Sequence, residues 1–268
     1  MTLVHDDPEW QQLLRIVADG VGRGVALVEK DYWVTHTLWA MLEQGFDLWF
    51  KGGTSLSKGF DLIERLSEDI DVRVDAGNSG LEPPRLSWKN TKTAGVEDRT
   101  RWFDRLADEL RVPGCTVRRD HAGSGPRVLE ASFQVLYPQL HAAGLPGAMR
   151  PFVLLEVGEA RVTPYVEVDL SSWVHDRLLQ SGQLADYADN RPQGVRCIHP
   201  WVTCLEKIDA IANRFRKGRP AETFVRHYED TAKILAERDR LPPLERGLPV
   251  LIAELAAKDK KPMPSPDD

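Results

Sequence analysis

Hydrophobic positions near the start of the chain repeat with the period of an α-helix. One apolar stripe is formed by Trp10, Leu13, Leu14, Val17 and Val21. After a break at residues 22–24, a second apolar-periodic run continues to Leu42. The pattern therefore predicts two helices within residues 8–44.

The pattern changes after this helical region. A short apolar run at residues 48–50 ends at Gly52 and Gly53, and a helical pattern follows over residues 55–66. Beyond it, apolar Ile70, Val72 and Val74 alternate with polar residues, which is typical of a strand with one buried face. The stretch predicts a strand, a glycine turn, a helix and a second strand.

The rest of the chain mixes strand and helix patterns. Residues 76–97 are polar and rich in Gly and Pro, which predicts a loop or a lid over the site. The remaining expected helices cover residues 99–110, 202–215, 221–238 and 249–257, and strands are expected near 117 and over 128–137, 152–157 and 165–170. We therefore expect an α+β fold. Its units are a core with a helical lead-in at 1–197, a helical C-terminal part at 198–258 and a disordered tail at 259–268.

The composition excludes several classes of protein but does not identify the function. Hydrophobic residues make up 42% and charged residues 28% of the 268, as in an ordinary globular protein. The net charge of −6 argues against coating nucleic acid through overall charge, but a local basic patch can still supply phosphate contacts. Neither a membrane-length apolar run nor a signal-peptide pattern is visible, so a cytoplasmic protein with no membrane partner is expected. The three cysteines are an odd number without metal-like spacing, which disfavours a disulfide framework or a zinc site.

Residues 48–58 predict a site for an anion. Gly52 and Gly53 allow a tight turn and close approach of a phosphate, and the helix that follows presents its positive end. Thr54 and Ser55 can cap this helix or bond a phosphate oxygen, and Lys58 follows one turn later. A glycine pair before a helix is more often a plain turn, so the neighbouring strand matters to the interpretation.

That second strand carries Asp69 and Asp71. Side chains alternate along a strand, so the two carboxylates share a face and repel each other unless a cation lies between them. Oxygen ligands of this kind suit Mg²⁺, which commonly binds one or two carboxylates together with substrate phosphates. An isolated Asp-x-Asp is usually a solvated strand face. Beside a phosphate-holding turn, it indicates phosphoryl or nucleotidyl transfer.

The segment FKGGTSLSKGFDLIERLSEDIDV, with LVEKDYWVTHTL before it at residues 27–38, resembles the AbiEii-type nucleotidyltransferases. The resemblance implies a polymerase-β-like nucleotidyltransferase core, a mixed sheet with flanking helices. Members act as toxins of toxin–antitoxin and phage-abortive-infection systems, among them the MenT toxins, which add nucleotides to tRNA 3′ ends. It also implies that Gly52, Gly53 and Thr54 form the nucleotide-holding turn, and that Asp69 and Asp71 bind one or two Mg²⁺.

The superfamily has a third carboxylate on a later strand. Glu156 in FVLLEVG is favoured here, because LEV resembles the family's corresponding segment better than the alternatives do. An acid among such apolar neighbours is also costly to bury unless it is paired or bound to metal. Glu167 and Asp169 in YVEVDL share a strand face and stay open as alternatives.

The C-terminal helices show a second matching pattern. TCLEKIDAIANRF resembles the family helix with a functional lysine, which places that role on Lys207. FVRHYED resembles an Arg-Asp-x-x-Asp segment and gives Arg226 and Asp230, with His227 departing from the pattern. Lys207 would reach a triphosphate, and Asp230 would orient Lys207 or act as a base. The plain alternative is an i,i+4 ion pair between Arg226 and Asp230.

Further basic residues stand near these motifs. Arg65 is expected to contact a phosphate or brace the acids, or to form an ordinary salt bridge with Glu64 or Glu68. The densest basic cluster is Arg214, Arg216, Lys217 and Arg219. It would hold an RNA backbone or complement the end of its helix.

Together these features predict an enzyme that moves a nucleoside monophosphate from an NTP to an acceptor hydroxyl and releases pyrophosphate. By resemblance the acceptor is the tRNA 3′ end, which would block translation and require a cognate antitoxin. The alternatives are transfer to Ser, Thr or Tyr of a protein, and a non-catalytic nucleotide-binding regulator.

Overall fold

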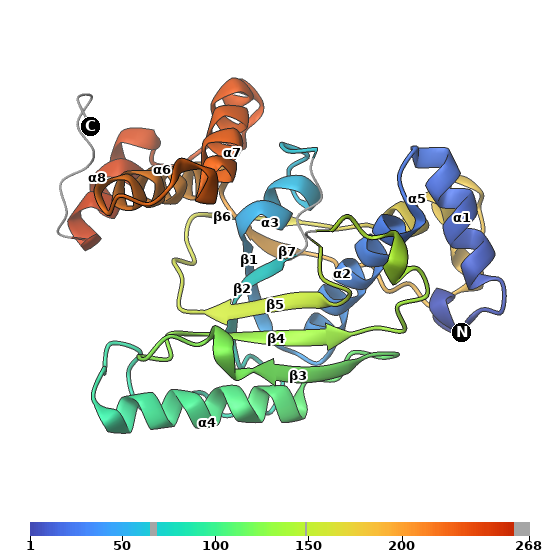
Figure 1. The fold of residues 1–268 in the computed structure, drawn as a ribbon, viewed down its shortest axis with the longest axis horizontal. Helices are drawn as coiled ribbons and strands as arrows, with labels where there is room; N and C mark the ends of the chain where they lie inside the picture. The colour runs from blue at the N-terminus through green and yellow to red at the C-terminus, as the bar shows by residue number, and fades with distance from the viewer. Residues whose placement is uncertain (65–68, 148, 260–268) are drawn as a thin grey trace.

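A single mixed sheet organises the molecule (Figure 1). The computed structural model describes residues 1–64, 69–147 and 149–259. The strands follow the order β3-β4-β5-β2-β1-β7-β6, with β2–β5 and β1–β7 parallel and the other pairs antiparallel. Their bounds are β1 (Asp47–Lys51), β2 (Asp69–Asp75), β3 (Thr116–Asp120), β4 (Glu130–Leu136), β5 (Val153–Gly158), β6 (Tyr165–Val168) and β7 (Val195–Ile198).

Helices gather in groups around this sheet. They are α1 (Trp10–Val21), α2 (Val25–Glu43), α3 (Gly52–Lys58), α4 (Thr93–Glu109), α5 (Trp173–Gln180), α6 (Pro200–Arg216), α7 (Val225–Ala236) and α8 (Leu248–Asp259). Figure 1 shows α4 beside β3, α1 and α5 together near the N-terminus, and α6, α7 and α8 at the opposite end. The α+β class expected from the sequence is confirmed.

One face of the sheet is buried, chiefly beneath α2. Ile70, Val72 and Val74 on β2 are at most 3% exposed and belong to one apolar cluster with side chains of α2 such as Trp33. Because strand side chains alternate, Asp69 and Asp71 must point to the other face. The hydrophobic pattern thus determines which face of the sheet presents the acids.

The C-terminal helices pack onto the core rather than standing apart from it. Cys204 of α6 and Ile234 of α7 form an apolar cluster with Leu56 of α3. Leu251 of α8 clusters with Ile198 at the end of β7, and Trp49 of β1 packs against this second group. Helix α6 begins two residues after β7 ends, close to the expected boundary at 198; the division into 1–197 and 198–258 stays a prediction.

Several expected boundaries were wrong. The helix expected at 55–66 begins at Gly52 and ends at Lys58, and Asp61 adopts a positive φ of 50° just beyond it. Apolar Leu62 and Ile63 imitate the helical period but are buried as an irregular segment. Helix α4 starts at Thr93 instead of 99, while α5 and the four-residue β7 were not expected at all.

The loop over residues 76–92 does not cover the acids. The backbone N–H of Asn78 donates to the carbonyl of Gly45 at 2.7 Å, which fixes the loop beside the start of β1 and away from its end at Lys51. Leu81 is 1% exposed, and Trp88 contacts Phe103 on α4. The expectation of a lid was wrong, because these apolar side chains fasten the segment beside α4.

Two further expectations concern the ends and the surroundings of the chain. Of the tail expected at 259–268, Asp259 closes α8 and the remainder lies outside the described residues. Within the described part, no helix is both long enough and apolar enough to span a membrane.

Candidate active site

Strands β1, β2 and β5 bring acidic and basic side chains together on the sheet face opposite the α2 side. In the pairing register, Asp71 lies between Lys51 of β1 and Glu156 of β5, while Asp69 is level with Leu154. The side chains of Asp69 and Asp71 are 36% and 27% exposed, so solvent and ligands can reach both. Lys51 Nζ stands 4.0 Å from Asp71 Oδ1.

The pKa of Glu156 is affected by these neighbouring negative charges. Its pKa is raised to about 7, first by burial and then by the charges of Asp71 and Asp69, and it also shares a hydrogen bond with Asp71. A carboxyl in these surroundings is stabilised in its neutral form unless a cation arrives. The strand register therefore places Glu156 beside Asp71, on the face that carries both β2 acids.

The alternative acids lie elsewhere. Strand β6 is separated from β2 by β1 and β7, and Glu167 on it is level with Arg196. Asp169 accepts a hydrogen bond from the backbone N–H of Gly194 at 2.8 Å. The structure does not bring Glu167 or Asp169 to the β2 acids.

The carboxylates suit a divalent cation in chemistry but are not gathered around one point. Among the described residues, no three His, Cys, Asp or Glu side chains are already arranged to hold an ion. The donor set of Asp69, Asp71 and Glu156 is nevertheless all carboxylate oxygen, which Mg²⁺ prefers. Their mutual repulsion, visible in the raised pKa of Glu156, is what a divalent cation would relieve.

The glycine turn lies directly against Asp71. Gly52 has a φ of +79°, and a Cβ added there would lie 2.1 Å from Asp71 Oδ2. A side chain at this position would therefore collide with the carboxylate as well as strain the backbone. This contact explains physically why glycine follows β1 at this point.

The two hydroxyl residues of the turn face inward. Thr54 and Ser55 are both fully buried. Thr54 Oγ1 donates to the carbonyl of Asp69 at 2.5 Å, and Ser55 Oγ donates to the carbonyl of Gly52 at 3.0 Å. Neither side chain caps the helix. Thr54 instead ties the turn to the start of β2, which holds Gly52 and the acids in a fixed relation.

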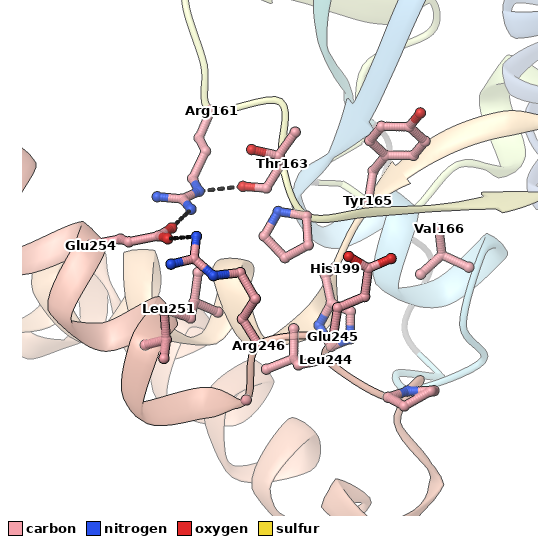
Figure 2. A pocket seen from close by; sticks show the side chains of 14 residues that line it. Arg161, Thr163, Tyr165, Val166, His199, Leu244, Glu245, Arg246, Leu251 and Glu254 are labelled. Atoms are coloured by element: carbon pink, nitrogen blue, oxygen red, sulfur yellow. Dashed lines mark hydrogen bonds and ion pairs between the residues drawn. The ribbon is translucent and has the colours of Figure 1, made fainter.

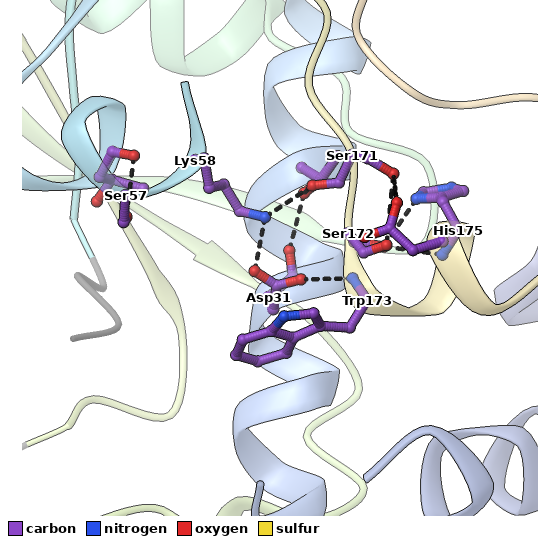
Figure 3. A network of polar contacts seen from close by, with 10 residues as sticks. Asp31, Ser57, Lys58, Ser171, Ser172, Trp173 and His175 are labelled. Carbon is purple, nitrogen blue, oxygen red and sulfur yellow. Dashed lines mark hydrogen bonds and ion pairs between the residues drawn. The ribbon is translucent and has the colours of Figure 1, made fainter. Parts of the chain in front are cut away.

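Lys58 is engaged in a buried network at the other end of α3 (Figure 3). Its Nζ lies 2.6 Å from Asp31 Oδ1, with side chains 8% and 5% exposed, and it donates to the carbonyl of Ser171 at 2.9 Å. Asp31 Oδ2 in turn accepts from the backbone N–H of Trp173 at 3.0 Å. Lys58 therefore joins α3 to α2 and to the start of α5, and it does not lie beside Asp69 and Asp71. Arg65, the other expected basic residue here, lies outside the described residues.

Lys207 and Asp230 form an ion pair between α6 and α7. Lys207 Nζ lies 2.9 Å from Asp230 Oδ2, and the two side chains are 13% and 1% exposed. The pair stands one turn from Cys204 and Ile234, the residues that pack against Leu56 of α3. Arg226 is exposed on α7. The pairing favours an orienting role for Asp230 over a plain surface pair with Arg226.

Arg150 joins the site from a segment that the sequence pattern did not single out. Its Nη1 lies 3.6 Å from Asp69 Oδ1, and its side chain is 50% exposed. The residue stands 81 positions from Asp69 in a loop before β5, and local periodicity carries no information about such a contact. Lys51 beside Asp71 was missed for the same reason.

A cavity of about 490 Å³ lies apart from these residues, between the 161–166 segment and α8 (Figure 2). Arg161 Nη2 and Arg246 Nη1 both contact Glu254, at 2.5 and 2.6 Å. The residues that line the cavity include none of the candidate catalytic residues. Glu254 contacts both arginines and Glu245 also lines the cavity, so two negative charges balance the two positive ones and the cavity offers little net charge to an anionic ligand.

The mixed sheet, with its helices and its acids on β2 beside a glycine turn, is that of a nucleotidyltransferase-like core. The family model described as "Nucleotidyl transferase AbiEii toxin, Type IV TA system" matches residues 41–268. The chain therefore belongs to the AbiEii family of nucleotidyltransferase toxins of type IV toxin–antitoxin systems. The match leaves out residues 27–38, and no curated protein matches the chain.

Proposed function

We propose that this protein transfers a nucleoside monophosphate from an NTP to an acceptor hydroxyl. The acceptor hydroxyl gives up its proton to solvent as its oxygen forms a bond to the α-phosphorus, the bond from that phosphorus to the bridging oxygen breaks, and pyrophosphate leaves. The observation that carries the proposal is the register of β2 and β5, which places Glu156 beside Asp71 with the glycine turn against the same carboxylate.

Three carboxylates would hold one or two Mg²⁺, namely Asp69, Asp71 and Glu156. Such an ion, when bound, supplies charge neutralisation on the triphosphate and activation of the attacking hydroxyl. The turn at Gly52 and Gly53 lets the triphosphate approach the backbone closely. Lys207 adds a positive charge from α6, and buried Asp230 keeps its ammonium oriented.

We further propose that the acceptor is the 3′ end of tRNA. Arg216, Lys217 and Arg219 are exposed at and just beyond the end of α6, nine or more residues along the chain from Lys207. A local basic patch of this kind can hold an RNA backbone despite the net charge of −6. Modified tRNA would stop translation in the cytoplasm, which accords with a toxin that a cognate antitoxin controls, including in phage defence.

The test uses the purified protein with total tRNA, Mg²⁺ and each α-labelled NTP separately. We expect label on tRNA with one NTP, and loss of at least about a hundredfold in rate for Asp69→Ala/Asp71→Ala, on the scale of lost electrostatic transition-state stabilisation. Glu167→Ala, on β6 with two strands between it and β2, serves as the matched acidic control and keeps the wild-type rate.

The outcomes separate the acceptors. Label on added protein but not on tRNA would replace the tRNA proposal with a protein Ser, Thr or Tyr acceptor. Absence of any Mg²⁺-dependent turnover, with NTP still bound, would leave only a nucleotide-binding regulator.

A further inference from the structure

We propose that Arg150 is a substrate-binding residue, which neutralises Asp69 before ligands bind and turns to the triphosphate when metal and NTP bind. The inference rests on the proposed function, because it takes the metal and the NTP from it. It concerns a residue outside every motif described above.

The first observation is the place of the guanidinium. Its Nη1 is 3.6 Å from Asp69 Oδ1, and half of the side chain is exposed. At 3.6 Å the contact is longer than a hydrogen bond, so it is an ion pair without a directional bond. A cation that competes for Asp69 acts directly against this attraction.

The second observation is the firm anchoring of the backbone that carries it. Lys30 of α2 is fully buried, and its Nζ donates to the carbonyls of Arg150 at 2.6 Å and Phe152 at 2.9 Å. Hydrogen bonds from a charged donor are stronger than neutral ones, especially away from water. Phe152 directly precedes β5, the strand of Glu156. The main chain of Arg150 is thus fixed relative to the acids, while half of its side chain is exposed.

Charge then decides where the side chain goes. A divalent cation on Asp69 would repel the guanidinium from the same carboxylate. The new anions in the site would be the phosphate oxygens that approach with the metal, and a guanidinium suits them through its paired donors. Arg150 would therefore compete with the metal before NTP binds and cooperate with it once NTP is present.

This double role gives two effects of opposite sign. In full-length Arg150→Ala without nucleotide, Mn²⁺ should bind at least about threefold more tightly than in wild type, because the competing cation is gone. With Ca²⁺ present to limit turnover, the NTP that wild type binds best should bind at least about tenfold more weakly, because a phosphate contact is lost. In Arg150→Lys both changes in affinity should be smaller than in Arg150→Ala, because lysine keeps the positive charge but lacks the paired donors of the guanidinium.

The measurements are Mn²⁺ titration by electron paramagnetic resonance and NTP titration by calorimetry. Arg105→Ala is the matched control, since Arg105 is 44% exposed and paired with Glu109 on the distant α4; it should change neither affinity. If Arg150→Ala weakens both ligands together, Arg150 merely supports the fold, and if it changes neither, it is a surface residue. Either result overturns the inference while wild-type binding stands, whereas wild type that binds neither Mn²⁺ nor NTP defeats the proposed function itself.

Discussion

At the scale of single residues, position 52 accepts only glycine. Two features of Gly52 exclude a side chain there: its φ of +79°, and the 2.1 Å that would separate an added Cβ from Asp71 Oδ2. The first makes any side chain strained, and the second pushes that side chain into a proposed metal ligand. Gly52 therefore belongs to the site through the shape it permits.

Gly52→Ala should lower the free energy of unfolding by about 1–3 kcal/mol, the usual cost of a non-glycine residue in this backbone region. It should also reduce nucleotidyl transfer at least about tenfold, because Asp71 must move from its position. Urea unfolding and the labelled-NTP assay measure the two effects. Gly20→Ala, where an added Cβ meets nothing within 4 Å, should leave both almost unchanged; equal behaviour of the two variants would contradict the argument.

At the scale of elements, the position of α3 depends on the contacts at its C-terminal end. The helix is only seven residues long, and its backbone starts at the glycine turn and ends at Lys58. Lys58 joins it to Asp31 of α2 through an ion pair whose two side chains are almost buried. A shift at Lys58 would therefore be transmitted along one short helix to Gly52.

Lys58→Met should destabilise the protein by about 3–5 kcal/mol, because removal of one partner leaves the buried charge of Asp31 uncompensated. Asp31→Asn/Lys58→Met should cost less than the sum of the two single changes, since it removes both charges. Lys89→Met on an exposed loop is the control. Urea unfolding of the set measures the coupling, and strictly additive effects would show that the pair has no special role.

The elements also show what a sequence can predict. The alternation in β2 predicted both the strand and the shared face of Asp69 and Asp71, because these are properties of adjacent residues. Neither the ion pair of Lys58 with Asp31 nor that of Arg150 with Asp69 could be predicted, since each joins segments distant in sequence. Helix α5 and β7 were missed because eight and four residues carry too little periodicity.

At the scale of the whole molecule, a buried polar network joins the N-terminal helices to the segment before β7. His36 is fully buried, with Nε2 at 3.0 Å from the carbonyl of Pro113 and Nδ1 at 2.8 Å from Asn190 Nδ2. Since the amide donates to Nδ1, Nε2 carries the proton and donates to the carbonyl. Burial lowers the pKa of His36 to about 3, helped by the charge of His5.

Stability should therefore fall as pH drops from about 6.5, the pKa of an unfolded histidine, towards 3. In this window the unfolded chain takes up a proton at His36 that the folded protein refuses, which favours unfolding. Above about 6.5 both states are neutral at this residue, and its effect vanishes. Unfolding in urea at a series of pH values measures this slope.

His36→Gln should be less stable at pH 7 but should lose part of the slope below pH 6.5. The comparison between variant and wild type isolates His36 from Glu156, whose raised pKa acts in the opposite direction between 4.5 and about 7. His121→Gln, at an exposed position, should keep the wild-type slope. Equal slopes in wild type and His36→Gln would show that His36 does not resist protonation in the fold.

One turn of α2 has a consequence for any attempt to dissect the protein. Consecutive Glu29, Lys30 and Asp31 are all buried, and they bind the 140–141 backbone, the 150–152 backbone and Lys58 respectively. A fragment trimmed to the family match at 41–268 would keep every proposed catalytic residue and lose all three attachments. The smallest active fragment must then begin upstream of residue 29. The segment that matches the family is therefore shorter than the segment that an active enzyme needs.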